Sequence, residues 1–282
     1  MNTSNNQKNL VKFIFCAVVF LIAYIPTFVW MWERWFAKES YYGHGILIPL
    51  VSFYVFWQRR SLLKTINISS SGWGLFIIAA GLVVHIVCAL LKIYFLSGFS
   101  LVLVLYGLVL FFFGKEISGK LIFPIFFLLA MIPLPLVLIS NLTVKLKLYA
   151  AHMATFTLNK IGFPSILDGS IIRMPNSFTN VGAPCSGLRS LISLLTLGII
   201  FSFFMKTSYI KKVLLLISAV PIAIVTNVMR ITMISIVNDL YGEKVALGFF
   251  HDFSGFLVFA FAFCGLFVVG RILEPNRDEN EK

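Results

Sequence analysis

The stretch GAPCSGLRSLISLLTLGIIFSFFM, residues 182–205, decides the class of the fold. From Leu191 onward it is almost entirely apolar, and with the preceding turn it reaches the ~20 residues that a helix needs to cross a bilayer. The rest of the 282-residue chain has the same character, because 59% of its residues are hydrophobic and only 12% are charged. This composition excludes a water-soluble globule and predicts an all-α, polytopic membrane protein.

Eight apolar stretches are candidate membrane-spanning helices. They cover residues 12–32, 45–57, 72–91, 94–113, 121–139, 187–205, 213–233 and 253–270. The first stretch is too long for the apolar part of a signal peptide and is not followed by a small-residue cleavage site, so we expect it to remain as an anchor. The sequence shows no internal repeat and no soluble second domain, which predicts a single integral membrane domain over residues 1–282.

The distribution of basic residues predicts the orientation of these helices. With the N-terminus in the cytoplasm, the short cytoplasmic loops carry clusters such as Arg59–Arg60 and Lys211–Lys212. Several other basic residues lie in one long segment, residues 140–186. Long loops count less than short ones in the rule that cytoplasmic loops carry an excess of basic residues. We therefore expect both termini in the cytoplasm and a multi-pass protein of the plasma (inner) membrane. The net charge of +12 is dispersed among loops, so nucleic acid is not an expected partner.

Residues 140–186 form the one loop long enough to have structure of its own, and they are expected on the extracytoplasmic side. Apolar residues recur at helical spacing in the first half of this segment: Leu142, Leu146, Tyr149, Met153 and Phe156. This pattern predicts an amphipathic helix at the membrane interface. In the second half, a turn at Asp168–Gly169 between two apolar runs predicts a short β-hairpin.

Cys185 lies where this polar segment meets the sixth apolar stretch. Gly182 and Pro184 cannot easily extend a helix upstream, so we expect Cys185 at the N-terminal end of the helix, on the outer side. The helix dipole and the charge of Arg189, one turn later, favour a thiolate there and predict a lowered pKa. The alternative is an inert, packed thiol, which is what we expect of the cysteines inside apolar stretches, namely Cys16, Cys88 and Cys264.

Two other polar positions are expected at the outer ends of their helices. A straight helix that starts near Lys212 lifts Arg230 by about 27 Å, and Asn227 lies one turn below it on the same face. His251 and Asp252 directly precede the eighth apolar stretch. A snorkelling arginine and an incidental interfacial histidine are the alternatives to a functional role.

The predicted topology brings Cys185, Arg230 and His251 to one side of the membrane at one depth. A thiol nucleophile, an imidazole that takes its proton and a guanidinium that stabilises an oxyanion form a set suited to acyl transfer. The sequence holds no metal-binding, phosphate-binding or serine-hydrolase motif that would compete, so no cofactor and no metal are expected. A non-enzymatic component of polysaccharide export, or a lipid carrier, remains the alternative from another class.

Four blocks of sequence resemble the exosortase/archaeosortase family of membrane transpeptidases: YYGHGILIP (41–49), IIRMPNSFTNVGAPCSGLRSL (171–191), PIAIVTNVMRI (221–231) and HDFSG (251–255). The resemblance implies cleavage of exported proteins that carry a C-terminal sorting signal, made of a PEP-like motif, a transmembrane helix and a basic cluster. It also implies that Cys185 is the nucleophile, Arg230 the essential arginine and His251 the histidine partner. The histidine favours the bacterial exosortase branch.

The resemblance and the chemistry together assign roles to further residues. The backbone N–H of Ser186 or Gly187 is expected to help Arg230 hold the oxyanion, with Asn227 and Asp252 as supporting residues. Arg189 is a weaker candidate for the oxyanion and is equally able to hold a lipid phosphate. His44 lies on the same outer side and is a candidate to line the path of the signal, although an interfacial aromatic belt explains its surroundings equally well. The acyl group then passes to an unidentified acceptor amine or, in a simple membrane cysteine peptidase, to water.

Overall fold

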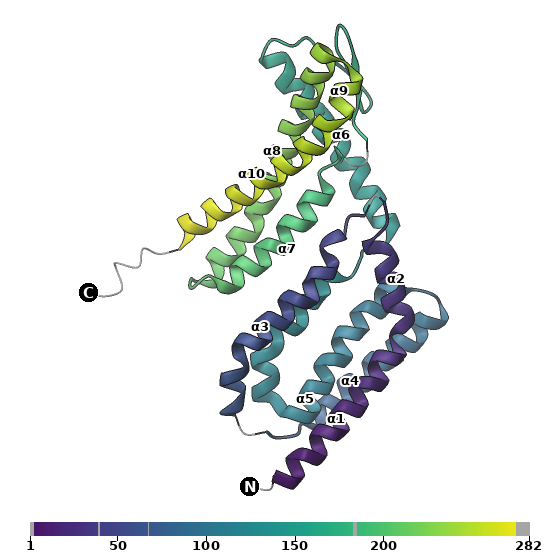
Figure 1. Cartoon of the computed structure of the whole chain (residues 1–282), viewed down its shortest axis with the longest axis vertical. Coiled ribbons are helices and arrows are strands. Elements are labelled where there is room, and N and C mark those ends of the chain that lie inside the picture. The colour runs from purple at the N-terminus through teal and green to yellow at the C-terminus, as the bar shows by residue number, and fades with distance from the viewer. Residues whose placement is uncertain (1–2, 39, 67, 183–184, 275–282) are drawn as a thin grey trace, which may run out of the picture. The chain divides into compact units, whose positions relative to one another are not determined.

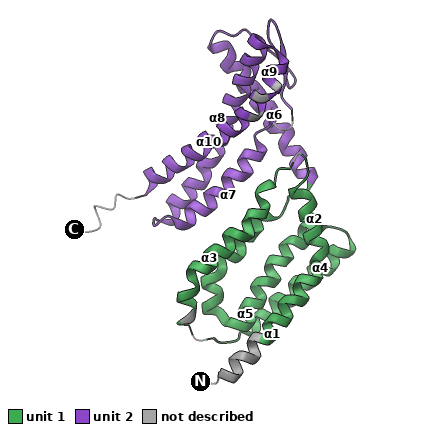
Figure 2. Cartoon of the chain, in the orientation of Figure 1, with its two compact units in different colours: residues 1–135 green, residues 136–282 purple. Residues whose placement is uncertain are grey.

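The computed structural model describes residues 3–38, 40–66, 68–182 and 185–274, without the side chains of residues 3–10, Lys64, Leu247, Phe249 and Asp252. Its regular structure is helical apart from one small sheet. The chain divides into two compact units, residues 1–135 and 136–282 (Figure 2), and each is described here by itself. That the two units act as one membrane domain stays a prediction.

The first unit consists of helices. Its elements are α1 (Thr3–Ala23), α2 (Ile25–Trp35), the 3₁₀ helix η1 (Gly43–Ile46), α3 (Leu47–Lys64), α4 (Gly72–Leu90), α5 (Tyr94–Phe127) and the 3₁₀ helix η2 (Leu128–Met131). Helices α4 and α5 lie side by side (Figure 1). A Cβ atom at Gly107 would lie 3.1 Å from the carbonyl oxygen of Gly74, so glycines allow these two backbones to approach closely.

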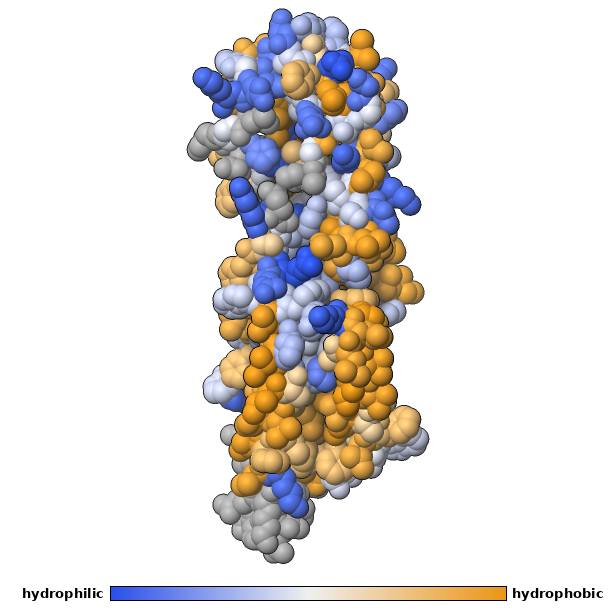
Figure 3. Space-filling model, turned by 90° about the vertical axis from the view of Figure 1, so that its right-hand side faces the viewer, coloured by the Kyte–Doolittle hydropathy of each residue, from blue (hydrophilic) through white to orange (hydrophobic). Residues whose placement is uncertain are grey.

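Within the described ranges, four helical segments are long and apolar enough to cross a membrane: Gly72–Leu90, Tyr94–Met131, Tyr209–Tyr241 and Phe253–Leu273. A fifth is counted if α1 and α2, which meet at a 57° bend, form one span. Large hydrophobic areas, orange in Figure 3, are exposed on the face shown there. A multi-pass membrane protein is therefore confirmed, with fewer qualifying helices than the eight expected.

Four of the eight expected stretches account for the difference from the five counted with the bent pair. The stretch 94–113 and the first part of the stretch 121–139 form one helical run that bends at Gly114 (φ +83°) and ends at Met131, before Pro133 and Pro135. Residues 136–139 already belong to the next helix, α6 (Leu136–Lys160). The stretch 187–205 forms a helix of 17 residues, which is apolar but shorter than the other spans. The stretch 45–57 continues into Arg59 and Arg60 in the same helix, which makes that helix more polar.

The second unit carries the candidate site. It contains α6 (Leu136–Lys160), strands β1 (Ile166–Asp168), β2 (Ile171–Arg173) and β3 (Phe178–Asn180), and helices α7 (Leu188–Phe204), α8 (Tyr209–Tyr241), α9 (Glu243–Leu247) and α10 (Phe249–Leu273). Helices α7, α8 and α10 pack together, and α6 packs against α8 (Figure 1). Leu194, Leu215 and Leu266, from these three helices, are fully buried in their common core.

The predicted helix and hairpin of residues 140–186 are both present, with two differences. The turn of the hairpin falls at Gly169–Ser170, one residue later than expected, because Asp168 still pairs with Ile171. A third strand, β3, pairs antiparallel with β2 and completes the sheet in the order β1-β2-β3. The sheet is fixed to α8 by the side-chain amide of Asn238, which donates to the carbonyl oxygen of Phe178 at 2.9 Å. The chain leaves β3 in the direction of Cys185.

Candidate active site

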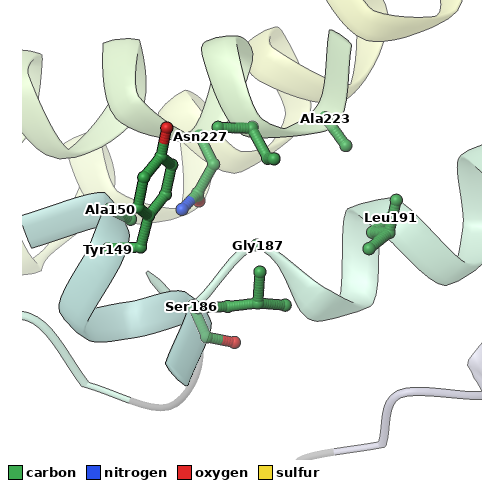
Figure 4. Close-up of a pocket in the computed structure, with 9 residues that line it drawn as sticks. Tyr149, Ala150, Ser186, Gly187, Leu191, Ala223 and Asn227 are labelled. Atoms are coloured by element: carbon green, nitrogen blue, oxygen red, sulfur yellow. The ribbon is translucent and has the colours of Figure 1, made fainter. Parts of the chain in front are cut away.

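Cys185 lies in the turn between the sheet and α7, three residues before the helix begins. Gly187 adopts a left-handed conformation (φ +78°) at the start of α7, and a Cβ atom there would lie 2.9 Å from Cγ of Asn227. Asn227, only 3% exposed, donates from Nδ2 to the carbonyl oxygen of Cys185 at 2.8 Å. Figure 4 shows this side chain between α8 and the turn at Ser186 and Gly187. The amide of Asn227 therefore fixes the backbone that carries the thiol.

Arg230 and His251 meet beside this turn. Arg230 extends from α8, one turn after Asn227, and His251 stands in the first turn of α10. The Sγ atom of Cys185 lies 3.9 Å from Nε2 of His251. The guanidinium of Arg230 lies 3.2 Å from the same Nε2 atom and donates to the backbone carbonyl oxygen of His251, also at 3.2 Å. The three residues predicted from the sequence are therefore in contact.

The contact between Arg230 and His251 identifies the hydrogen-bond donor and acceptor. A guanidinium offers only N–H donors, so Arg230 donates from Nη2 and Nε2 of His251 accepts. The single lone pair on Nε2 is then directed at Arg230, and the thiol of Cys185 is a second, more distant neighbour. A proton transfer from the thiol to Nε2 would therefore require the guanidinium to turn away first.

The pKa of Cys185 shifts in the direction opposite to the one expected from the sequence. Burial raises the pKa of the thiol above its usual value, and the positive charge of Arg230 opposes this effect. The physical reason is position: Cys185 precedes α7 and packs against a cluster that includes Ile172 and Ile231, so loss of solvent outweighs the helix dipole. Arg189 is exposed, and the charge that acts on the thiol is that of Arg230. The expectation of a lowered pKa was wrong.

A cleft of about 340 Å³, within the size range of small-molecule sites, is lined by Arg230 and His251, the two residues that contact each other beside Cys185. Its polar lining comes from the start of α7, from α8 and from α10: Arg189, Ser190, Ser193, Asn227, Arg230 and His251. Val258 and Phe259 of α10 form an apolar wall. The cleft can therefore receive a chain that has both backbone polar groups and apolar side chains.

The remaining predicted residues have different positions. Ser186 is buried, and its hydroxyl accepts from the backbone N–H of Leu188 at 3.4 Å, so it supports the first turn of α7. Arg189 lines the cleft. His44 belongs to the first unit, where its ring stacks on Tyr42 and burial lowers its pKa; its role near the signal stays a prediction. The side chain of Asp252 lies outside the described residues.

Sequence reasoning missed Ser254 and Gly255. Ser254 is fully buried, and its hydroxyl accepts from Nε of Arg230 at 3.4 Å and donates to the carbonyl oxygen of His251 at 2.9 Å. A Cβ atom at Gly255 would lie 3.3 Å from Nη2 of Arg230. The sequence did contain a signal for Ser254, because a serine three residues after a functional histidine lies on the same face of the helix as that histidine. Among the described residues, no group of three His, Cys, Asp or Glu side chains could hold a metal ion.

Comparison with known proteins gives one match. The family model described as Transmembrane exosortase (Exosortase_EpsH) matches residues 32–268, a range that includes Cys185, Arg230 and His251. No curated protein and no solved structure matches the chain significantly. The family match covers most of the chain and both compact units, and it agrees with the multi-pass helical architecture. The chain therefore belongs to the transmembrane exosortase family.

Proposed function

We propose that this exosortase-family protein is a cysteine transpeptidase that cleaves the C-terminal sorting signal of exported proteins at the outer face of the plasma membrane. The contact of Cys185, Arg230 and His251 beside the cleft is the observation that carries the proposal. The substrate class, a protein ending in a PEP-like motif, a transmembrane helix and a basic tail, follows from the family resemblance. Membrane lipids surround the site and orient the signal.

The first chemical step joins substrate binding to activation of the thiol. The scissile carbonyl oxygen of the substrate draws the guanidinium of Arg230 away from Nε2 of His251. The freed Nε2 then accepts the thiol proton, and Sγ of Cys185 attacks the carbonyl carbon. Arg230 and the backbone N–H of Gly187 stabilise the oxyanion that forms. A thiol with a raised pKa needs this base, because little thiolate is present at neutral pH.

The second step breaks the peptide bond and transfers the acyl group. The leaving amine takes the proton from Nε2 of His251, the C–N bond breaks, and a thioester to Cys185 remains. An acceptor amine, or water in a simple cysteine peptidase, then gives a proton to Nε2 of His251 and attacks the thioester carbonyl carbon. The C–S bond breaks, and Sγ of Cys185 takes the proton back from Nε2, which restores the thiol and the neutral imidazole. The same residues serve both acceptors, so the mass of the product distinguishes a transpeptidase from a peptidase.

Hydroxylamine tests whether a thioester forms. We expect membranes that contain the protein and a reporter ending in the tripartite signal to yield a cleaved reporter with a C-terminal hydroxamate when hydroxylamine is added. The reason is that a small, uncharged amine competes for the thioester of Cys185. Mass spectrometry of the cleaved reporter is the measurement. A product that ends in a carboxylate at every hydroxylamine concentration would contradict an acyl-enzyme, and an uncut reporter would argue for a non-enzymatic protein.

Alkylation of Cys185 tests the side of the membrane and the state of the thiol. With both termini in the cytoplasm, as proposed, a membrane-impermeant maleimide should label Cys185 in intact cells. In isolated membranes, the labelling rate should rise with pH to a midpoint above that of an ordinary exposed thiol, because burial raises the pKa and fewer thiolates exist at neutral pH.

The matched control is the thiol introduced by Asn176→Cys in a Cys185→Ala chain, since Asn176 is exposed in the same segment. Cys16, Cys88 and Cys264 are replaced by alanine in both chains. Arg230→Gln should move the midpoint of Cys185 further up, because it removes the opposing charge. Labelling only after the cells are opened would reverse the proposed orientation, and a midpoint below that of the control would contradict the burial effect.

A further inference from the structure

Ser254 has contacts that a buried serine in an apolar helix does not need. It stands one turn after His251 on α10 and is 0% exposed. Its hydroxyl donates to the carbonyl oxygen of His251 at 2.9 Å and accepts from Nε of Arg230 at 3.4 Å. The directions are fixed, because a carbonyl oxygen can only accept and a guanidinium nitrogen can only donate. A single hydroxyl therefore links the arginine of α8 to the helix that carries the histidine.

The two ends of the guanidinium have different partners. Its Nε end is bound to Ser254, whereas its Nη2 end contacts Nε2 and the backbone carbonyl oxygen of His251. The reaction requires only the Nη end to move, from the imidazole to the oxyanion. An arginine that is held at Nε can redirect its Nη groups without losing its place in the cleft.

We propose that Ser254 is a positioning residue of the transfer reaction, whose hydroxyl holds Nε of Arg230 while the Nη groups move from His251 to the substrate oxyanion. This inference rests on the proposed function, because it needs Arg230 to act on the oxyanion. Gly255 completes the arrangement: a Cβ atom there would approach Nη2 of Arg230 to 3.3 Å, so the glycine leaves the guanidinium room. Ser254 itself does not reach the reacting atoms and acts through Arg230.

If Ser254 only stabilised its own helix turn, its replacement would have a different effect on cleavage. A serine hydroxyl that bonds to the carbonyl oxygen three residues earlier is common in helices and requires no arginine. If the bond to His251 were the whole function of Ser254, its removal would have the same effect whatever residue occupied position 230. The dependence of the effect on Arg230 therefore separates the two roles.

The test is a double-mutant cycle on cleavage of the tripartite-signal reporter in detergent-solubilised membranes. We expect Ser254→Ala to lower kcat by about tenfold with an unchanged KM, because a misplaced guanidinium fails in the transition state and not in substrate binding. In an Arg230→Lys chain, Ser254→Ala should cause no further loss, because lysine has no Nε–H group for the hydroxyl to hold. Ser235→Ala is the matched control.

Ser235 suits this purpose because it is also 0% exposed, lies on α8, and has no hydrogen-bond partner among the described residues. Its replacement should leave kcat and protein level unchanged. A wild-type kcat in Ser254→Ala, or an equal loss with Arg230 and with Lys at position 230, would overturn the inference. Continued cleavage in Cys185→Ala would instead overturn the proposed function, so the two failures are distinguishable.

Discussion

Cys185→Ala is expected to abolish cleavage of the reporter signal, by a factor of at least ~10⁴, while the protein remains in the membrane at its normal level. In the proposed mechanism the thiol of Cys185 is the group that forms the acyl-enzyme. Its loss should hardly affect folding, because Asn227 binds the backbone carbonyl oxygen of Cys185, and alanine keeps that bond. Immunoblots of processed and unprocessed reporter, together with the level of the membrane protein, measure both effects.

The other cysteines of the chain provide the controls. Cys16 and Cys88 belong to the first unit, and Cys264 lies on an exposed face of α10, well along the helix from His251. Alanine at each of these three positions should leave cleavage close to wild type. If the reporter is still processed normally in Cys185→Ala, the mechanism does not use a thiol.

Arg230→Lys is expected to lower the cleavage rate by about 10²- to 10³-fold at wild-type protein level, the usual loss when one oxyanion donor is removed. Arg230 uses its planar fork in three directions, to Ser254, to Nε2 of His251 and to the carbonyl oxygen of His251. Lysine keeps the charge but offers a single flexible ammonium group, which cannot hold Ser254 and the oxyanion together. The measurement is the initial rate of reporter cleavage in membranes.

Two further substitutions make the arginine result interpretable. Arg271→Lys, at the exposed end of α10, changes an arginine far along the helix from His251 and should leave the rate unchanged. Asn227→Ala should show a milder defect than Arg230→Lys, since it loosens the carbonyl of Cys185 and leaves the guanidinium in place. A near-normal rate in Arg230→Lys would mean that position 230 needs only a snorkelling cation, and Cys185 and His251 would carry the site alone.

Local signals predicted much of the fold. The apolar stretches gave the membrane class and the positions of most helices, because burial in lipid requires long apolar runs. The turn residues at Asp168–Gly169 predicted the hairpin, but β3 has only three residues, and it forms because β2 pairs with it and Asn238 binds it. Helix length was harder to predict, since the helix end before Pro133 and the bend at Gly114 depend on backbone geometry more than on hydropathy.

The candidate site, like the fold, could be predicted only in part. The charge bias of the loops and the spacing along each helix predicted that Cys185, Arg230 and His251 lie together, and they are in contact; the side of the membrane stays a prediction. The sign of the thiol's pKa shift was missed, because it depends on how tightly the turn packs against α8 and the sheet, and no local pattern encodes that packing. Ser254 was missed because its significance comes from a contact with a residue 24 positions earlier in the chain.

The partly buried thiol of Cys185, with its raised pKa, has a consequence for its resistance to oxidation. If the site lies on the outer face, as proposed, it meets an oxidising environment, in which exposed thiolates are converted to sulfenic acid and then to irreversible products. The raised pKa keeps Cys185 as a thiol, and Arg230 occupies the lone pair of the base that would ionise it. In the proposed mechanism the thiolate forms only when a substrate has drawn Arg230 away, so the resting thiol would be protected from oxidation.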